Sequence, residues 1–474
     1  LESRLQGTAL RLPAPFGKPA AEAMPVAVQL RREGGARTLM VDLAGTLASA
    51  QIRLPASEGG TWAAEVAFGE AAPPPPIGVD GLRVVGVLPQ ADLLQWHRLL
   101  PEGGGDVGVL RALALRVARL RIGGVSLDDQ QLSLQPEPGG YHLALEGSAV
   151  GDIRWDTALT AVRADLASLS MGFEGVRIEG GDMSTDSPPG ANLQPDTWPA
   201  LTVRAGKLSL NGLALGEAQL LTERLADGMQ LTRFDLAGGQ LEGHVEGEWR
   251  RNARRGSATL TFDLSSPAVE PTLQAFGFAP SLRAERTVIE GSLHWPDTPL
   301  ALDWTQGEGE VHLRVRDGTL RTIEPGAGRV LGLMSFYALP RRLTLDFRDV
   351  VDDGLRFDSI AADFELADGL ARSDNLEIRA PSLRMEIDGS IDLAHRTLDQ
   401  RVKVLPGLSG GMTLGAALLG GPAVGAIMLL AQELLEKPLD QVTQFGYRVQ
   451  GSWDNPEVTP LDARGLAPQE NQTP

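Results

Sequence analysis

The sequence predicts a mainly β protein with mostly antiparallel strands, and three observations lead to this fold class. From about residue 200 onward, apolar residues fall at every second position, as at Leu376, Ile378 and Ala380, which is the period of a strand with one apolar face. Asp-Gly pairs, which favour tight hairpin turns, recur between such runs. The 56 glycines and 32 prolines suit many short turns and would interrupt long helices.

Further alternating runs predict the positions of individual strands. Their apolar positions are Leu241, Val245 and Trp249; Leu260, Phe262 and Leu264; Val311, Leu313 and Val315; Leu343, Leu345 and Phe347; and Leu383, Met385 and Ile387. Turns are expected at Asp317-Gly318, Asp353-Gly354, Asp368-Gly369 and Asp388-Gly389. Strands buried on both faces would instead show continuous apolar runs, so the alternation indicates one apolar face and antiparallel neighbours.

The first 200 residues show the same texture with more interruptions. Pro-rich stretches at 72–76 and 187–199 predict exposed loops. Short helical patterns at 91–100, 271–276 and 327–338 are too short to found a helical domain, and we expect them to plug or cover the sheet.

Residues 405–432 carry no charged side chain, and Gly420-Gly421-Pro422 divides them into halves too short to span a bilayer. This predicts an uncharged helical hairpin over 405–437 that contacts a membrane or a partner, the alternative being that it covers the end of the β structure. The residues expected to make the contact are Met412, Leu418, Leu419, Val424, Ile427, Met428 and Leu430.

Composition excludes several classes of protein. The chain has no cysteine, which removes thiol nucleophiles, thiolate metal sites and disulfides. A net charge of −18 would repel a phosphate backbone, so no nucleic-acid partner is expected. The chain opens without an initiator Met, signal peptide or apolar anchor, and we expect it to be a fragment of a larger protein.

Two glycine motifs point to chemistry, but their contexts do not support it. Residues 407–411 match G-x-S-x-G around Ser409, yet the last histidine, His395, precedes them, whereas the nucleophile elbow needs a histidine downstream. Gly103, Gly105 and Gly108 match G-x-G-x-x-G without the strand that a dinucleotide site requires before it. Both are interpreted as flexible loops.

Histidines and acidic residues do not form a recognisable site. None of the six histidines (His97, His142, His244, His294, His312 and His395) has another at helical spacing. Asp346, Asp349, Asp352 and Asp353 are interpreted as a solvated strand end. The sequence therefore predicts no catalytic residues, no metal, no cofactor and no enzymatic activity.

Four arginines, Arg250, Arg251, Arg254 and Arg255, crowd one expected hairpin loop. They suit a strand end protected against aggregation, and the alternative is contact with anionic lipid headgroups.

The C-terminal third carries a series of short signatures that resembles the C-terminal region of a member of the AsmA-like family of bacterial envelope proteins. They are PGAGRVLGL (325–333), ALPRRL (338–343), LDFRD (345–349), FDSI (357–360), LDQ (398–400) and YRVQGSWDNP (447–456). The resemblance is strong over 290–460 and rests, before that, on residues 12–25 and the strand texture.

The resemblance implies a long, curled sheet with a hydrophobic groove along which phospholipid passes to the outer membrane. It implies the periplasm of a Gram-negative bacterium, an inner-membrane anchor in a missing N-terminal part, and an outer-membrane contact at the C-terminal end. Four segments are expected: groove repeats with Pro-rich loops (1–195), groove repeats of the AsmA-like C-terminal region (196–404), the hairpin (405–437), and a final strand with a polar tail (438–474).

The residues expected to line the groove are the alternating apolar positions. They are Leu241, Val245, Leu260, Phe262, Val311, Leu313, Val315, Leu343, Leu345, Phe347, Phe357, Phe364, Leu376, Ile378, Leu383, Met385 and Ile387. Periodicity alone leaves two functions open, because an apolar face can cover a ligand or a second layer. The first is a lipid conduit, and the second is a structural or adaptor protein of envelope assembly with a dry β core.

Overall fold

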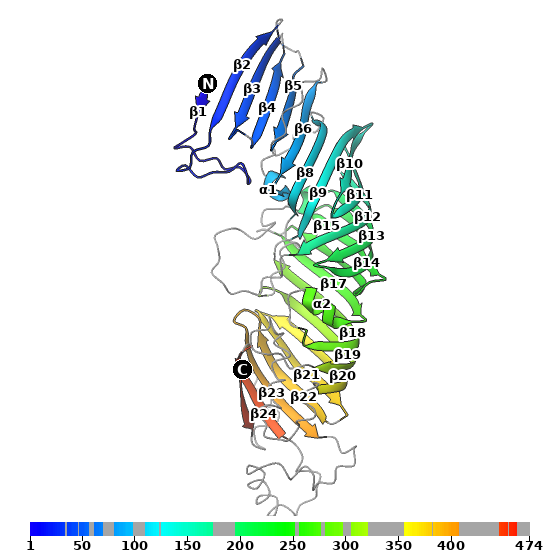
Figure 1. Ribbon diagram of the computed structural model, residues 1–474. Helices are drawn as coiled ribbons and strands as arrows, with labels where there is room; N and C mark the ends of the chain where they lie inside the picture. Colours follow the sequence, from blue (N-terminus) through cyan, green and yellow to red (C-terminus); the bar gives the residue numbers. More distant parts are fainter. Residues whose placement is uncertain are drawn as a thin grey trace, which may run out of the picture. The chain divides into compact units, whose positions relative to one another are not determined.

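The fold consists almost entirely of β-strands. A computed structural model describes residues 1–33, 36–45, 47–55, 61–69, 80–97, 110–122, 125–173, 195–251, 256–275, 280–296, 305–320, 355–381, 383–406, 445–453 and 455–461. Across these residues, 25 strands belong to one mixed sheet (Figure 1). Two short helices, α1 (Leu93–His97) and α2 (Val269–Ala275), and a 3₁₀ turn (Pro195–Thr197) accompany them. The predicted β class is confirmed.

The chain divides into two compact units, each of which is described by itself. The first comprises Leu1–Glu174, Ser187–Leu236 and Trp249–Gly256, and the second Gly175–Asp186, Ala237–Glu248 and Ser257–Pro474. The strands that fall mostly in the first unit are β1 (Glu2–Ser3), β2 (Val26–Glu33), β3 (Ala36–Leu43), β4 (Ala48–Leu54), β5 (Ala63–Phe68), β6 (Gly81–Leu88), β7 (Ala91–Asp92), β8 (Leu110–Ile122), β9 (Val125–Glu137), β10 (Gly140–Glu146), β11 (Ala149–Asp156), β12 (Ala161–Phe173), β13 (Ala200–Leu210), β14 (Leu213–Leu225) and β15 (Gly228–Ala237).

Most neighbours in the first unit are antiparallel, but some are not. Strands β5 and β6, β6 and β8, β7 and β8, and β12 and β13 pair in parallel. Parallel neighbours need a long connection, and the intervals 69–80 and 174–199, where Pro-rich loops were expected, supply the length. The prediction of mostly antiparallel neighbours is confirmed for the described strands, and these pairs are exceptions to it.

The segment before β2 is held together by a buried lysine. Lys18 is 6% exposed, and its Nζ donates to the carbonyl oxygens of Leu5 at 2.7 Å and Glu22 at 2.8 Å. Phe16 packs beside Phe68, with ring centroids 5.1 Å apart. A buried ammonium needs such oxygen partners, and here the loop backbone provides them.

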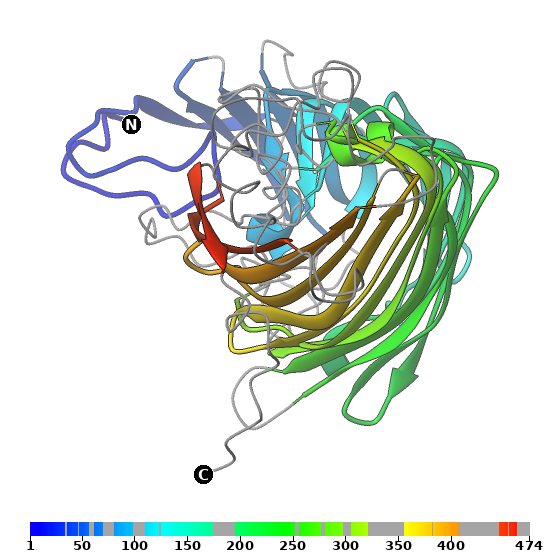
Figure 2. The same cartoon turned by 90° about the horizontal axis from the view of Figure 1, so that it is seen from below.

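The strands that fall mostly in the second unit are β16 (Glu242–Arg250), β17 (Ser257–Ser266), β18 (Leu282–Pro296), β19 (Glu308–Leu320), β20 (Leu355–Ala367), β21 (Leu370–Ala380), β22 (Leu383–Asp392), β23 (Thr397–Pro406), β24 (Phe445–Ser452) and β25 (Asn455–Leu461). From β17 to β25 each strand pairs antiparallel with the next in the chain. Figure 2 shows these strands bending along their length, so the sheet of this unit is curled, as predicted.

The Asp-Gly pairs fall in two different environments. Asp368-Gly369 joins β20 to β21 with φ of 52° and 74°, which is the predicted two-residue hairpin turn. Asp317 and Gly389 instead lie inside β19 and β22, so turns at those two pairs were wrongly predicted. Asp317 has φ of 49° and Gly389 lies opposite a register shift in β21, so both belong to irregularities within the strands.

Candidate functional site

A continuous apolar face crosses the second unit from β17 to β25. Directly paired residues on neighbouring antiparallel strands lie on the same face. The register pairs Ile378 with both Ile360 and Met385. The same relationship pairs Leu260 with Leu293, Leu264 with Ile289, Ile289 with Leu313, Val311 with Phe364, Leu313 with Ala362, Val315 with Ile360, Leu376 with Ile387, Ile387 with Val402, Ile391 with Leu398, Val402 with Tyr447, and Val449 with Val458.

Glycines on this face make room for aromatic rings of the neighbouring strand. Gly291 lies opposite Phe262, and a Cβ on Gly291 would stand 2.9 Å from Phe262 Cζ. Gly318 lies opposite Phe357, whose ring would meet a Cβ there in the same way. Because such a distance is well inside van der Waals contact, each ring lies over its glycine.

The face is buried unevenly. Val315, Ile378 and Ile387 are at most 3% exposed. A group of apolar side chains in β17, β18 and β19, which we call the open group, is only half-buried. It comprises Leu260, Phe262, Leu264, Ile289, Val311 and Leu313. Half-buried side chains within a continuous apolar face leave area that an apolar ligand can cover.

Most predicted groove residues are brought together on this face. The buried ones are Val315, Phe357, Phe364, Leu376, Ile378, Met385 and Ile387, and the half-buried ones are Leu260, Phe262, Val311, Leu313 and Leu383. Val245 is half-buried in the preceding strand, β16. Leu241 is half-buried just before β16, and Leu343, Leu345 and Phe347 lie outside the described residues.

Sequence reasoning missed several members of the face. They are Ile289, Leu293, Ile360, Ile391, Leu398, Val402, Tyr447 and Val449. The spacing of Ile289, Leu293 and Trp295 is a period-two signal that could have revealed β18. Near Asp317 the alternation changes phase because of the irregularity there, so a strict period could not follow the face.

The first unit has a comparable apolar face. Leu134 on β9 pairs with Leu113 on β8 and Leu143 on β10. Gln130 also lies on this face, fully buried, and its side-chain oxygen accepts the Ala149 amide at 2.9 Å. This polar residue is satisfied by backbone, so it adds rigidity rather than a free ligand group.

The opposite face of the second unit is charged. Its acidic and basic side chains pair across strands, as Arg448 does with Asp399 at 3.0 Å. Similar contacts join Arg401 with Asp388, Lys403 with Glu386, Arg384 with Glu377 and Arg314 with Asp363. Such pairs add little stability each but keep this side of the sheet in water.

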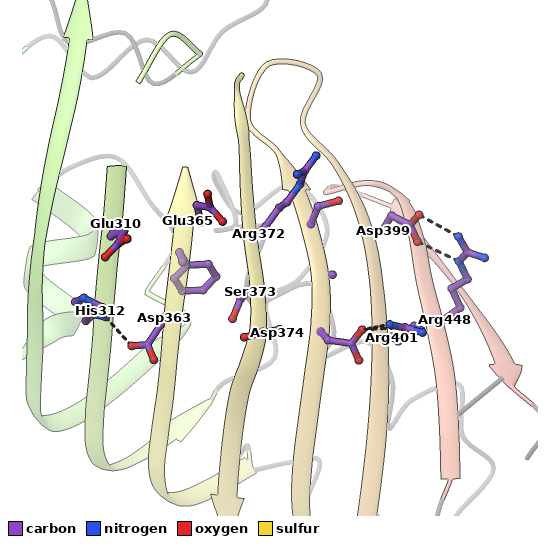
Figure 3. A pocket seen from close by; sticks show the side chains of 14 residues that line it. Glu310, His312, Asp363, Glu365, Arg372, Ser373, Asp374, Asp399, Arg401 and Arg448 are labelled. Atoms are coloured by element: carbon purple, nitrogen blue, oxygen red, sulfur yellow. Dashed lines mark hydrogen bonds and ion pairs between the residues drawn. The ribbon is translucent and has the colours of Figure 1, made fainter. Parts of the chain in front are cut away.

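A depression of about 630 Å³ lies on the charged face (Figure 3). At its edge His312 Nδ1 lies 2.7 Å from Asp363 Oδ1, and Asn375 Nδ2 donates to Asp363 Oδ2 at 2.6 Å. The contact with His312, joined by Asn375 and Arg314 and opposed by burial, lowers the pKa of Asp363 to about 2. Asp363 is therefore ionised at neutral pH and cannot serve as a general acid.

The histidines form separate contacts rather than one site. They pair His142 with Asp152, His244 with Glu246, His294 with Thr259, His312 with Asp363, and His395 with Asp392. In the described part of the chain, no three His, Cys, Asp or Glu side chains gather as metal ligands would.

Two arginines of the arginine-rich loop form ion pairs with aspartates of the same chain. Arg250 donates to Asp227 at 2.9 Å, and Arg251 forms an ion pair with Asp196. Two of the four arginines are thus neutralised internally, which weakens their proposed role in binding headgroups.

Several other predictions fall outside the described residues. These are the G-x-S-x-G and G-x-G-x-x-G motifs, the aspartates at 346–353, Arg254 and Arg255, the helical pattern at 327–338, and the helical hairpin with all its expected contact residues. Among the helices the structure describes, none has the length and apolar character needed to cross a bilayer.

A β-sheet with one continuous apolar face and one charged face defines a class of scaffold that offers surface rather than a catalytic pocket. The family model described as YhdP protein matches residues 1–458, and the chain belongs to this family. A curated relative, the intermembrane phospholipid transporter YhdP of Escherichia coli (strain K12), is 25% identical over 97% of this chain. The chain spans 37% of that relative's length. No solved structure matches.

These comparisons confirm the family that the C-terminal signatures resembled. The relative itself is named as a transporter and not as an enzyme.

Proposed function

We propose that this chain is part of an envelope phospholipid transporter and that it holds acyl chains against the apolar face of β17–β25. The observation that carries the proposal is the open group, whose apolar side chains share one face and stay half-buried. Family membership and the printed function of the E. coli relative support phospholipid as the cargo.

Acyl chains suit this face because apolar contacts have no required direction. Each methylene that leaves water contributes about 0.8 kcal/mol, so a few contacts suffice to hold a chain. Neighbouring apolar residues on this face offer similar surface, so a lipid can move from one to the next at little cost in free energy. Transport then needs no indispensable residue, which agrees with the predicted absence of a catalytic centre.

The resemblance extends this proposal to a place in the cell. The protein would lie in the periplasm of a Gram-negative bacterium, between an inner-membrane anchor and the outer membrane or an outer-membrane protein. The segment 405–437, which carries no charged side chain up to residue 432, is proposed as the contact at the outer-membrane end, because a long uncharged stretch suits a membrane or a partner surface.

The second candidate is a structural or adaptor protein with a dry core. The burial of Phe357, Ile378 and Val402 favours a dry core over the strands from β20 to β23, where little apolar area is left for a ligand. The open group has no place in this candidate, because a closed core would bury it.

Native mass spectrometry of the chain prepared without detergent separates the two functions. A conduit should carry phospholipid adducts that exchange with added lipid of another acyl length. A chain free of lipid, with the open group protected from solvent labelling, would favour the dry core.

A further inference from the structure

Strand β25 is the last strand that the structure describes in the second unit's sheet. Among the described strands it pairs with β24 alone, in the register that sets Ser452 opposite Asn455 and Val449 opposite Val458. Figure 1 shows these two strands in red. A strand with one partner presents its other edge to whatever can add to the sheet.

The hydrogen-bond pattern identifies which residues of β25 face that free edge. The Trp453 amide donates to Arg396 O at 3.0 Å, on the β23 side of β24. Amides alternate in direction along a strand, so the even-numbered residues of β24 donate toward β25. Their partners on β25 are the odd-numbered residues, which leaves Pro456, Val458 and Pro460 directed outward.

Two of these three outward positions are prolines, which have no N–H to donate. Val458 thus offers the one outward amide among them, flanked on each side by a pyrrolidine ring. Strand addition needs a donor at every second residue and a close backbone approach, and the prolines deny both.

We infer that β25 is a terminal edge blocked by Pro456 and Pro460 against strand addition by a second copy of this chain. Without the prolines, the free edge of β25 could pair with a strand of a second copy, and the chain would self-associate. Because no second copy adds to β25, the apolar face that includes Tyr447 and Val449 is not continued into another sheet. A lipid on this face can therefore reach the end of the sheet.

The test replaces both prolines by threonine, Pro456→Thr with Pro460→Thr, in the full 474-residue chain. The matched control is Glu457→Thr, which adds the same β-favouring residue to the same strand but at a position directed toward β24. Light scattering coupled to size exclusion, over a concentration series, measures self-association. The double variant should associate at concentrations at least tenfold lower than the parent, and the control should match the parent.

Hydrogen exchange then locates the new contact. Amides at positions 456 and 460 should be protected in the associated form of the double variant. The inference is overturned if the folded double variant stays as monomeric as the parent, or if the parent already protects the Val458 amide in a dimer. Should the double variant misfold, as seen by circular dichroism, the two single variants carry the test, and neither associating more than the parent would also overturn it.

Discussion

Phe262 lies across the sheet from Gly291, so close that a Cβ on the glycine would stand 2.9 Å from the ring's Cζ. The ring occupies the place of a missing side chain and covers the glycine backbone. Because Gly291 has no side chain, the large Phe262 ring fits against the backbone of the neighbouring strand.

Replacing Gly291 by valine should force Phe262 away and should also crowd the backbone oxygen of Glu310, which an added Cβ would approach more closely than the ring. The free energy of unfolding should therefore fall by about 1–3 kcal/mol, because overpacking strains the neighbouring strands. The double variant with Phe262→Ala should lose less than the sum of the two single losses. Urea unfolding followed by circular dichroism measures both. Ser292→Val, on the exposed side of the same strand, is the control and should change stability by less than about 0.5 kcal/mol. Additive losses would show that the ring does not cover the glycine.

A charge in the open group should block lipid binding. Leu313→Arg places an ion where acyl chains would lie, which costs several kcal/mol without a partner. Phospholipid that copurifies with the chain, quantified by mass spectrometry, should fall at least tenfold. Thr261→Arg, at an exposed position of β17 on the charged face, should leave the lipid content unchanged. Equal lipid in both folded variants would contradict the proposed face.

The carboxyl of Asp363 should titrate near pH 2 in the folded chain, against about 3.9 in unfolded peptides. Because folding lowers this pKa, the ionised group stabilises the fold above about pH 4, and this contribution is lost as the pH falls toward 2. The side chain is 39% exposed, so solvent screening limits the effect, and Asp363→Asn should cost about 0.5–1 kcal/mol at pH 7. Carbon-detected NMR of the carboxyl gives the pKa directly. A midpoint near 4 would refute the network with His312, Asn375 and Arg314.

Trp453, in the last of the C-terminal signatures, closes a corner of the sheet. Its Nε1 donates to Thr397 O at 3.2 Å, and the Arg396 guanidinium lies 5.8 Å from its ring centroid. Trp453→Phe should lower the free energy of unfolding by about 1–2 kcal/mol through the lost hydrogen bond and a weaker cation–π contact. Trp62→Phe, at a side chain that is 39% exposed, should have little effect. If the two losses in urea unfolding are equal, the corner does not depend on Trp453.

Single residues show how far sequence reasoning reached. The alternation of Leu376, Ile378 and Met385 correctly placed them on one face, because an antiparallel register preserves a period of two. Asp317 was misread as a turn residue, since an Asp in the left-handed region suits a strand irregularity as well as a hairpin turn. The parallel pairing of β12 with β13 was missed because the order of strands depends on tertiary packing, which local periodicity does not encode.

The difference in exposure along the apolar face was also beyond the sequence. Val315 and Leu313 lie two positions apart in β19 and look equivalent in the pattern, yet one is 1% exposed and the other half-buried. Burial at each position depends on what neighbouring strands and helices cover, so the open group could be located only in the structure.

The most direct test of lipid binding on the apolar face places a photoreactive amino acid at Leu313 or, in a matched chain, at Arg314, the next residue of β19, which is exposed. Illumination in cells, followed by mass spectrometry of the purified chain, measures covalent phospholipid adducts at each position. The account predicts adducts from position 313 and none above background from 314. Equal labelling at both positions, or labelling at 314 alone, would contradict it.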